Sequence, residues 1–273
     1  MSTALHAATG YPDLLRRVRA GELGPDPAHQ RISVAFSTSQ AVRHPGRTRG
    51  YHNEVLSLRL AGAVGCCAVE PGALRAGTLD ECVGVDVATL LDHRLPAVRV
   101  AALDAYLLHA FPPHRDPRAR PHRLPAGTSL DKSRARARAV ADLLPATARQ
   151  VLVVGVVNSL LEALRARGIG YLPCDLKGGS TEWDEPIHAD AAAVLDRCDA
   201  LLVSGMTLGN GSFEALRQHA AHHGKPLVVF AQTGSAIAPR LLAAGVSAVC
   251  AEPYPFFWLD GGDSVIYRYG QPC

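Results

Sequence analysis

The fold is decided by the stretch Val151-Leu-Val-Val-Gly-Val-Val-Asn-Ser159, near the middle of the 273-residue chain. Its short apolar run, rich in β-branched residues, predicts a strand that is buried on both faces of a sheet. Gly155 permits a tight turn, and Asn158 and Ser159 are residue types that cap helix N-termini. A helix is therefore expected over 160–167. A strand, a tight turn and a helix in this order are typical of the start of an open α/β sheet.

The same unit recurs towards the C-terminus. Strand-like runs occupy 169–172, 200–204, 226–230 and 247–250, and helices are expected over 189–195, 212–222 and 236–244. Strands that alternate with helices predict a parallel sheet with right-handed crossovers. Residues 264–269 are expected to add a last strand at the edge of this sheet.

The first 110 residues show a different pattern, with strands followed by helices. An amphipathic helix is expected over 11–23, and strands over 31–42 and 54–70, the second being one strand or two broken at 62–65. The short connection between 42 and 54 favours antiparallel pairing. Helices are expected over 86–93 and 96–110. This order is typical of an α+β domain.

A segment rich in proline and arginine separates the two halves. Five prolines fall within 111–127, so no regular element is expected there, and its basic side chains are interpreted as solvated. A helix over 131–144 should follow. We predict an α/β protein in which a smaller α+β domain (1–110) and a linker (111–130) precede a Rossmann-like parallel sheet (131–273).

Composition restricts the class of protein. Hydrophobic residues make up 48% and charged residues 19% of the chain, which is typical of a globular protein. The net charge is only +3, and many arginines lie within 115–138, so no nucleic-acid partner is expected. No apolar run approaches the roughly 20 residues that span a bilayer, and the first residues lack a signal-peptide layout. A cytoplasmic protein without a membrane partner is expected.

The cysteines predict buried thiols. The chain has seven, none in a Cys-x-x-Cys pair, which argues against a closed structural zinc site. Cys66, Cys67, Cys82 and Cys250 lie in apolar runs, where reduced cysteine packs as a small hydrophobic residue.

Polar residues that follow the predicted strands indicate a ligand site, because ligands bind beyond the carboxyl ends of strands in open parallel sheets. The expected ligand-binding residues are Asn158, Ser159, Asp175, Thr207, Asn210, Gln232, Thr233 and Ser235, with Glu252 close by. The glycine-flanked turns 207–212 and 232–235 either bind an anion at a helix N-terminus or only cap the helix. The turn after the first strand is not G-x-G-x-x-G, which argues against ordinary NAD or ATP binding.

The loop 174–188 carries the most reactive side chains. It holds a thiol, a lysine, a histidine and four carboxylates: Asp175, Glu182, Asp184 and Glu185. Cys174 and His188 are candidate ligands for a transition metal, and Lys177 and Glu182 are candidate acid/base groups. The alternative is a solvated polar loop. His52 faces the same side of its strand as Glu54 and is the third candidate metal ligand.

Three stretches carry a resemblance to a known family. They are Thr207-Leu-Gly-Asn-Gly-Ser212, the stretch 228–246, and Val98-Arg-Val-Ala-Ala-Leu-Asp-Ala-Tyr106. They resemble the Thr-x-x-Asn-Gly-Thr, Gly-Pro-Ser-x-Pro and Gly-x-Ala-x-x-Asn-Ala segments of the putative heavy-metal chelation family. The resemblance implies an enolase N-terminal-like domain, a Rossmann-like domain and a ligand cleft between them. Gln232-Thr-Gly-Ser235 and Asp104 depart from the family pattern at this cleft.

Two hypotheses for function follow. The first is a binding protein for a metal, a small molecule or a metal complex, in metal-related or specialised metabolism, with a transition-metal ion as the candidate cofactor. The second is a biosynthetic enzyme that acts on a small carboxylate-bearing metabolite in the same cleft. The aromatic cluster Tyr254, Phe256, Phe257 and Trp258 is either a homodimer contact or a lid on the core.

Overall fold

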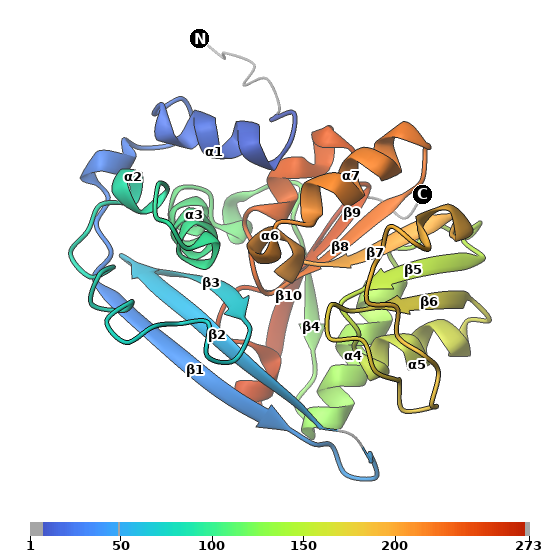
Figure 1. Ribbon diagram of the computed structural model, residues 1–273. Helices are drawn as coiled ribbons and strands as arrows, with labels where there is room; N and C mark the ends of the chain where they lie inside the picture. The colour runs from blue at the N-terminus through green and yellow to red at the C-terminus, as the bar shows by residue number, and fades with distance from the viewer. Residues whose placement is uncertain (1–7, 49, 271–273) are drawn as a thin grey trace.

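Two β-sheets organise the protein, one of three strands and one of seven. The computed structural model describes residues 8–48 and 50–270. Figure 1 shows the smaller sheet with the N-terminal helices beside it, and the larger sheet between two layers of helices. None of the helices formed by the described residues is long and apolar enough to cross a membrane.

The small sheet is an antiparallel meander of β1 (Val34–Val42), β2 (Tyr51–Leu60) and β3 (Ala63–Val69). Of the two interpretations of 54–70, the pair of strands is correct. Leu56, Leu58 and Leu60 alternate along β2 and bury one face of the sheet in the core shared with α3 (Pro96–Ala110). Around these elements lie α1 (Tyr11–Arg19), η1 (Pro27–His29) and α2 (Val87–Leu90).

The large sheet has the strand order β4-β10-β9-β8-β7-β5-β6. Its strands are β4 (Arg120–Leu124), β5 (Gln150–Val154), β6 (Gly170–Cys174), β7 (Ala200–Ser204), β8 (Leu227–Ala231), β9 (Ala248–Ala251) and β10 (Ser264–Tyr269). The run from β6 to β9 is parallel, and β10 and β4 are antiparallel additions. After β5 the chain adds β6 on one side and β7, β8 and β9 on the other, so the strand order reverses between β5 and β7, as in a doubly wound sheet.

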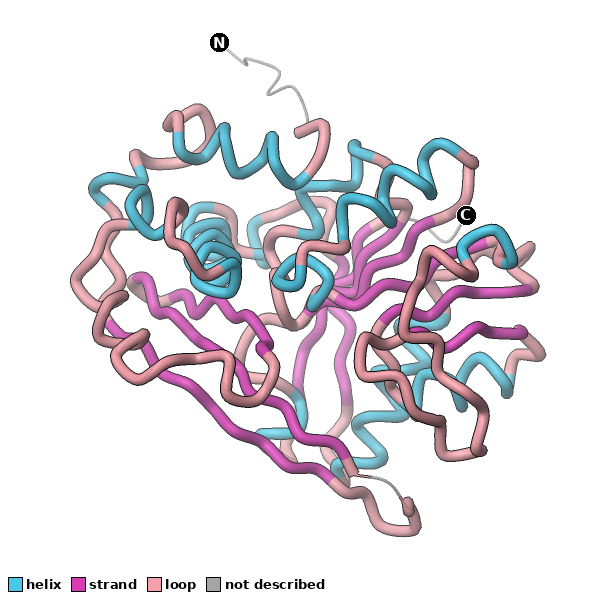
Figure 2. Tube along the Cα trace, in the orientation of Figure 1, coloured by secondary structure: helices cyan, strands magenta, loops and turns pink. Residues whose placement is uncertain are grey.

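Helices cover both faces of this sheet (Figure 2). On one face lie α4 (Ser129–Ala141) and α5 (Asn158–Ala166), and on the other α6 (Met206–Asn210), α7 (Phe213–His222) and the 3-10 helix η4 (Ala238–Ala244). The remaining 3-10 turns are η2 (Pro113–Arg115), η3 (Leu195–Arg197) and η5 (Phe257–Leu259).

The strand β5 confirms the prediction from the deciding stretch. Val151 and Val153 are buried in the core beneath α4 and α5, whereas Leu152 and Val154 are buried in the core on the opposite face. The α/β class, with a mainly parallel sheet after a smaller α+β part, is confirmed as well. The domain limits at 110 and 130 remain a prediction.

Three local predictions are wrong. The proline-rich linker contains β4, because β10 supplies an antiparallel partner along 120–124. For the same reason β10 is an inner strand, and β4 takes the edge. Residues 189–194 form turns where a helix was expected, and only the short η3 follows. Asp190, whose side chain accepts from the backbone N–H of Ala192, favours a turn at this point.

Gly65 should be essential for the packing of β3 on α3. A Cβ atom there would lie 2.0 Å from the backbone nitrogen of Ala105 and 2.3 Å from the carbonyl oxygen of Ala101. We expect Gly65→Ala to lower the free energy of unfolding by about 3 kcal/mol, measured by urea denaturation. Gly62→Ala is the matched control, since nothing lies within 4 Å of a Cβ at that position. Equal stability of the two variants would contradict this packing.

Candidate functional site

A cavity of about 500 Å³ lies at the carboxyl edge of the large sheet. Its floor comes from the ends of β5, β6, β7 and β8, through Gly155, Asp175, Ser204 and Gln232. The cavity therefore lies beside the point between β5 and β7 where the strand order reverses. The helices that follow these strands lie on opposite faces of the sheet, and a crevice forms between them. The predicted position of the ligand site agrees with this geometry.

The first turn of α5 opens onto this cavity. Asn158 and Ser159 were expected to cap the helix, but the N-cap is Val157, which provides no side-chain cap, and both residues line the cavity. Among the described residues, none accepts a hydrogen bond from the backbone N–H groups of Asn158 and Ser159. The Oδ1 atom of Asn158 is buried and has no hydrogen-bond donor. Free N–H groups and the helix dipole give this end of α5 a preference for an anionic or acceptor group.

A buried ion pair fixes the part of the wall that comes from α4. The Nε–H of Arg136 on α4 donates to Glu252 Oε2 at 2.6 Å, and the two side chains are only 9% and 2% exposed. The second oxygen of Glu252 accepts from the backbone N–H of Phe257 at 2.7 Å. The side-chain amide of Gln232 donates to Oε2 of Glu252 at 2.9 Å. The carboxylate is thus satisfied on both oxygens, which a buried charge requires.

The same face of α4 continues the wall. Ser133, Arg136, Ala137 and Val140 have helical spacing and all line the cavity. Ser133 donates a hydrogen bond to Ser159 at 3.0 Å, which joins α4 to the first turn of α5. The sequence did not predict the burial of Arg136, which lies in the arginine-rich stretch 115–138. Lys132 is buried too, because its ammonium group donates to the Asp260 carbonyl at 2.9 Å and to Ser264 at 2.7 Å.

Aromatic side chains form the apolar part of the lining: Tyr51, Phe230, Phe256, Phe257 and Trp258. Phe256 and Phe257 are buried, Phe256 packing with Val55 and Cys66 of the small sheet. The guanidinium of Arg136 lies 5.8 Å from the Phe230 ring centre and 5.9 Å from that of Phe257. Of the two interpretations of the aromatic cluster, the lid on the core fits these contacts, and a homodimer remains a prediction.

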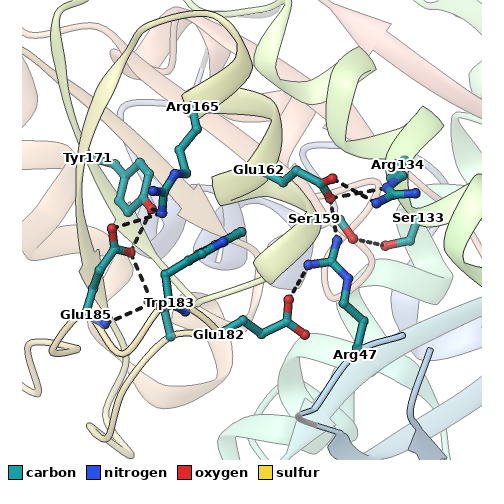
Figure 3. A network of polar contacts seen from close by, with 11 residues as sticks. Arg47, Ser133, Arg134, Ser159, Glu162, Arg165, Tyr171, Glu182, Trp183 and Glu185 are labelled. Atoms are coloured by element: carbon teal, nitrogen blue, oxygen red, sulfur yellow. Dashed lines mark hydrogen bonds and ion pairs between the residues drawn. The ribbon is translucent and has the colours of Figure 1, made fainter. Parts of the chain in front are cut away.

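The turn between β1 and β2 reaches the far rim of the cavity. Arg47 forms ion pairs with Glu162 of α5 and Glu182 of the 174–188 loop (Figure 3). His44 shares a hydrogen bond with Ser129 at the start of α4 at 3.0 Å. Burial lowers the pKa of His44, and the neighbouring guanidinium of Arg47 lowers it further. The small sheet and the large sheet therefore close the cavity together.

The 174–188 loop is held in place by its own polar groups. Glu185 accepts from Tyr171 at 2.7 Å and from Thr181 at 3.0 Å, and Arg165 stacks over Trp183 at 4.6 Å (Figure 3). The interpretation as a freely solvated loop does not fit these contacts. Glu182 lies inside the cavity and is paired with Arg47, whereas Lys177 is half exposed and pairs with Glu70 at 3.0 Å.

The charges on the cavity wall balance. Among the residues that the structure describes, three positive residues (Arg47, Arg136, Lys177) and three negative residues (Glu70, Asp175, Glu182) line it. Most are paired with each other or with Glu252, and Asp175 accepts from the backbone N–H of Lys177 at 3.1 Å. The cavity therefore offers no excess of negative charge to a bare cation.

Seven predicted residues converge on the cavity besides His52: Asn158, Ser159, Asp175, Lys177, Glu182, Gln232 and Thr233. Thr207 and Asn210 do not line it. Thr207 is buried in α6 and donates to the Ser204 carbonyl at 2.7 Å, and Asn210 accepts from the backbone N–H of Ser212 at 3.1 Å. The N-cap of α7 is Ser212, which makes no side-chain cap hydrogen bond, so neither the anion site nor the side-chain cap expected at this turn is seen.

Ser235 lies outside the cavity because a carboxylate of the chain occupies its turn. Asp104 of α3 accepts from the backbone N–H groups of Ala236 at 2.7 Å and Cys66 at 3.0 Å. The Asp104 side chain thus occupies the position where an anionic ligand was expected at 232–235. Complete burial raises the pKa of Asp104 to about 7, although the three hydrogen bonds it accepts, including one from Ser235, act in the opposite direction.

The three candidate metal ligands do not converge. Among the described residues, the only group of three or more metal-ligating side chains excludes Cys174, His188 and His52. Cys174 is 3% exposed, and burial raises the pKa of its thiol to about 11, which disfavours the thiolate that binds metal. Cys174 and His188 meet only through a backbone bridge. His52 shares a hydrogen bond with Ser39 at 2.7 Å.

The other cysteines behave as the sequence predicts. Cys66, Cys67, Cys82 and Cys250 are free and buried, and burial raises the pKa of each thiol. No thiol lines the cavity within the described part of the chain. The donor groups present there do not fit a thiolate site for a heavy metal.

The family comparison agrees with the sequence motifs. The DUF364 family, described as putative heavy-metal chelation, matches residues 139–250. The matched stretch, residues 139–250, is similar to this family. The family predicted from the sequence is therefore confirmed, and the DUF364 match includes α5 and the ends of β5 to β8 that form the cavity floor.

Two solved DUF364 proteins, both of unknown function, share the fold. The protein from Desulfitobacterium hafniense DCB-2 is 13% identical with a TM-score of 0.58, over 88% of this chain and 83% of its own. The protein from Pyrococcus horikoshii is 13% identical with a TM-score of 0.56, over 93% of this chain and 98% of its own. At this identity the likeness shows the fold alone. No curated protein matches the sequence.

The Arg136–Glu252 pair should dominate the stability of the site. Glu252→Ala leaves a buried guanidinium without its partner, so we expect a loss of about 3–5 kcal/mol in the free energy of unfolding. Lys177→Ala, which removes an exposed ion pair of the same cavity, should change it by less than about 1 kcal/mol. Urea denaturation measures both. A loss below 1 kcal/mol for Glu252→Ala would contradict the buried pair.

Asp104 should make stability depend on pH. The pKa of Asp104 is about 7 in the folded protein and 3.8 ordinarily. The protonated side chain therefore contributes its full stability below pH 3.8, and this stability is lost as the pH rises through about 7. Between pH 5 and 7, the native protein should lose about 2 kcal/mol more unfolding free energy than Asp104→Asn. Equal pH slopes for the two proteins in urea denaturation would show that Asp104 is already ionised at pH 5.

Proposed function

We propose that the protein binds a small organic molecule in the cavity at the carboxyl edge of the large sheet. The observation that carries this proposal is the first turn of α5, which has no side-chain cap and opens into the cavity beside Arg136. A volume of about 500 Å³ is within the usual range for small-molecule sites. The mixture of aromatic walls and a few fixed polar groups is also usual for such sites.

The chemistry of the wall defines the ligand class. The N–H groups of Asn158 and Ser159 would bind a carboxylate or a comparable acceptor group. The aromatic side chains of Phe256, Phe257 and Trp258 would cover an apolar portion. The balanced wall charges favour a molecule whose own charges are few. This is the binding-protein hypothesis, with the ligand narrowed to a carboxylate-bearing organic molecule.

A metal-carrying form of the ligand is the second candidate, supported by the family description of residues 139–250. The organic part would hold the ion, because the described lining residues include no thiol and no excess of carboxylates. The enzyme hypothesis receives less support. Lys177 and Glu182 are each engaged in an ion pair, so neither is placed as an unhindered acid/base group.

Asn158→Asp tests the proposed site with a minimal change in shape. An aspartate at the first turn of α5 keeps the helix stable, because negative charge is favoured there, but it repels a carboxylate. We expect native mass spectrometry of protein purified without chelator or denaturant to show an organic adduct in the native protein. Occupancy in Asn158→Asp should fall at least tenfold. Elemental analysis of the same sample decides whether the adduct carries a metal.

The matched control is Asn210→Asp, the same replacement at an exposed residue outside the cavity, which should retain the adduct. Full occupancy in Asn158→Asp, or loss of the adduct in Asn210→Asp alone, would place the ligand elsewhere. A native protein without any adduct would contradict tight binding in this cavity.

A further inference from the structure

A second group of ligating side chains lies at the opposite edge of the large sheet. Asp196 belongs to η3, and His219 and His223 lie at the end of α7. Asp196 precedes the start of β7 at Ala200 by four residues, and His223 precedes the start of β8 at Leu227 by four. Because β7 and β8 are parallel neighbours, these two residues meet at the amino edge, away from the carboxyl-edge cavity.

The three side chains are close enough to share one ion. One ligand atom of each lies within 4.8 Å of the other two. His219 and His223 are one helical turn apart, with ring centres 4.3 Å from each other. Histidines at this spacing on one helix face are a recurrent metal-binding pair. The Nε2 atom of His219 lies 3.8 Å from Oδ1 of Asp196.

Only a small movement would complete the coordination. Metal–ligand bonds of about 2.0–2.1 Å in a tetrahedron place ligand atoms roughly 3.3 Å apart. The Asp196 side chain is 87% exposed and His223 is exposed, so both can approach His219 without disturbing the core. Three protein ligands leave a position open to water.

His219 is the least exposed member and has an unsatisfied atom. Its side chain is 17% exposed, and its Nε2 atom is buried with no hydrogen-bond partner. Buried polar atoms without a hydrogen-bond partner are rare, and a bound ion would supply a partner for this nitrogen.

The surrounding charges act in two directions. The last turn of α7 carries the negative end of the helix dipole, which favours a cation. Lys225 opposes a cation, but its ammonium group is held by the Leu195 carbonyl at 2.6 Å. Asp196 supplies the compensating negative charge.

We propose that Asp196, His219 and His223 bind one divalent transition-metal ion of the zinc type. Imidazole and carboxylate ligands suit Zn²⁺ and its neighbours in the series. The site is separate from the organic-ligand cavity and uses no thiol. It places metal binding on histidines near the sheet's amino edge, in contrast to the Cys174, His188 and His52 set.

Isothermal titration calorimetry of the metal-free full chain with Zn²⁺ tests this site. We expect saturation at one ion per chain. His223→Ala and Asp196→Ala, at exposed positions, should each weaken binding at least tenfold and leave the fold unchanged by circular dichroism. His219→Gln should do the same, although a loss of folding in this variant alone would leave the two exposed variants to decide.

Two controls separate this site from its rivals. His222→Ala removes the neighbouring exposed histidine that is not part of the group, and Cys174→Ser removes the thiol near the cavity. Both should bind Zn²⁺ as the native chain does. The proposal is overturned if the native chain shows no saturable binding, or if the combined His223→Ala, Asp196→Ala variant binds within twofold of it. Loss of binding in Cys174→Ser would also overturn it.

Discussion

The buried ion pair between Arg136 and Glu252 is the interaction on which the cavity depends. Two charges withdrawn from water are tolerated only when their hydrogen-bonding groups are satisfied. Glu252 achieves this with donors from Arg136, Gln232 and the Phe257 backbone, so one carboxylate joins α4, the end of β8 and the aromatic segment. These elements are then fixed around a common space. Lys132 and Ser133 add further polar contacts between α4 and its neighbours.

A second buried carboxylate ties the two sheets together. Asp104 on α3 reaches both Cys66 of the small sheet and Ala236, just after the end of β8 in the large sheet. It fills the turn where the family pattern and the helix geometry suggest an anion. The protein therefore has one turn, at 232–235, closed by its own carboxylate, and one helix start, at α5, left open to the cavity. The start of α5 is therefore the position of the two that is free to bind a ligand in the cavity.

The placement of thiols and imidazoles bears on the family description. The described cysteines are buried and their thiols are poor metal ligands, whereas three polar ligands gather on the exposed end of α7 and η3. Parallel strands bring loop residues together at both edges of the sheet. The carboxyl edge is deep because helices diverge there, and the amino edge is shallow and accessible to solvent. An organic ligand suits the first edge and a hydrated ion the second.

The sequence by itself determined the strands and helices with a strong apolar pattern, such as β5, α3 and α7, because a continuous apolar run and helical spacing both reflect burial directly. It also determined the edge on which Asn158, Asp175 and Gln232 converge, since parallel strands share a carboxyl edge. The helical spacing of Ser133, Arg136, Ala137 and Val140 was a signal for the wall on α4 that the sequence-based prediction did not use. Only the tertiary structure decided that β4 pairs in a proline-rich segment, that Arg136 is buried against Glu252, and that Asp104 occupies the turn at 232–235. Each of these depends on a partner more than 100 residues away, and spacing along the chain carries no information about such partners.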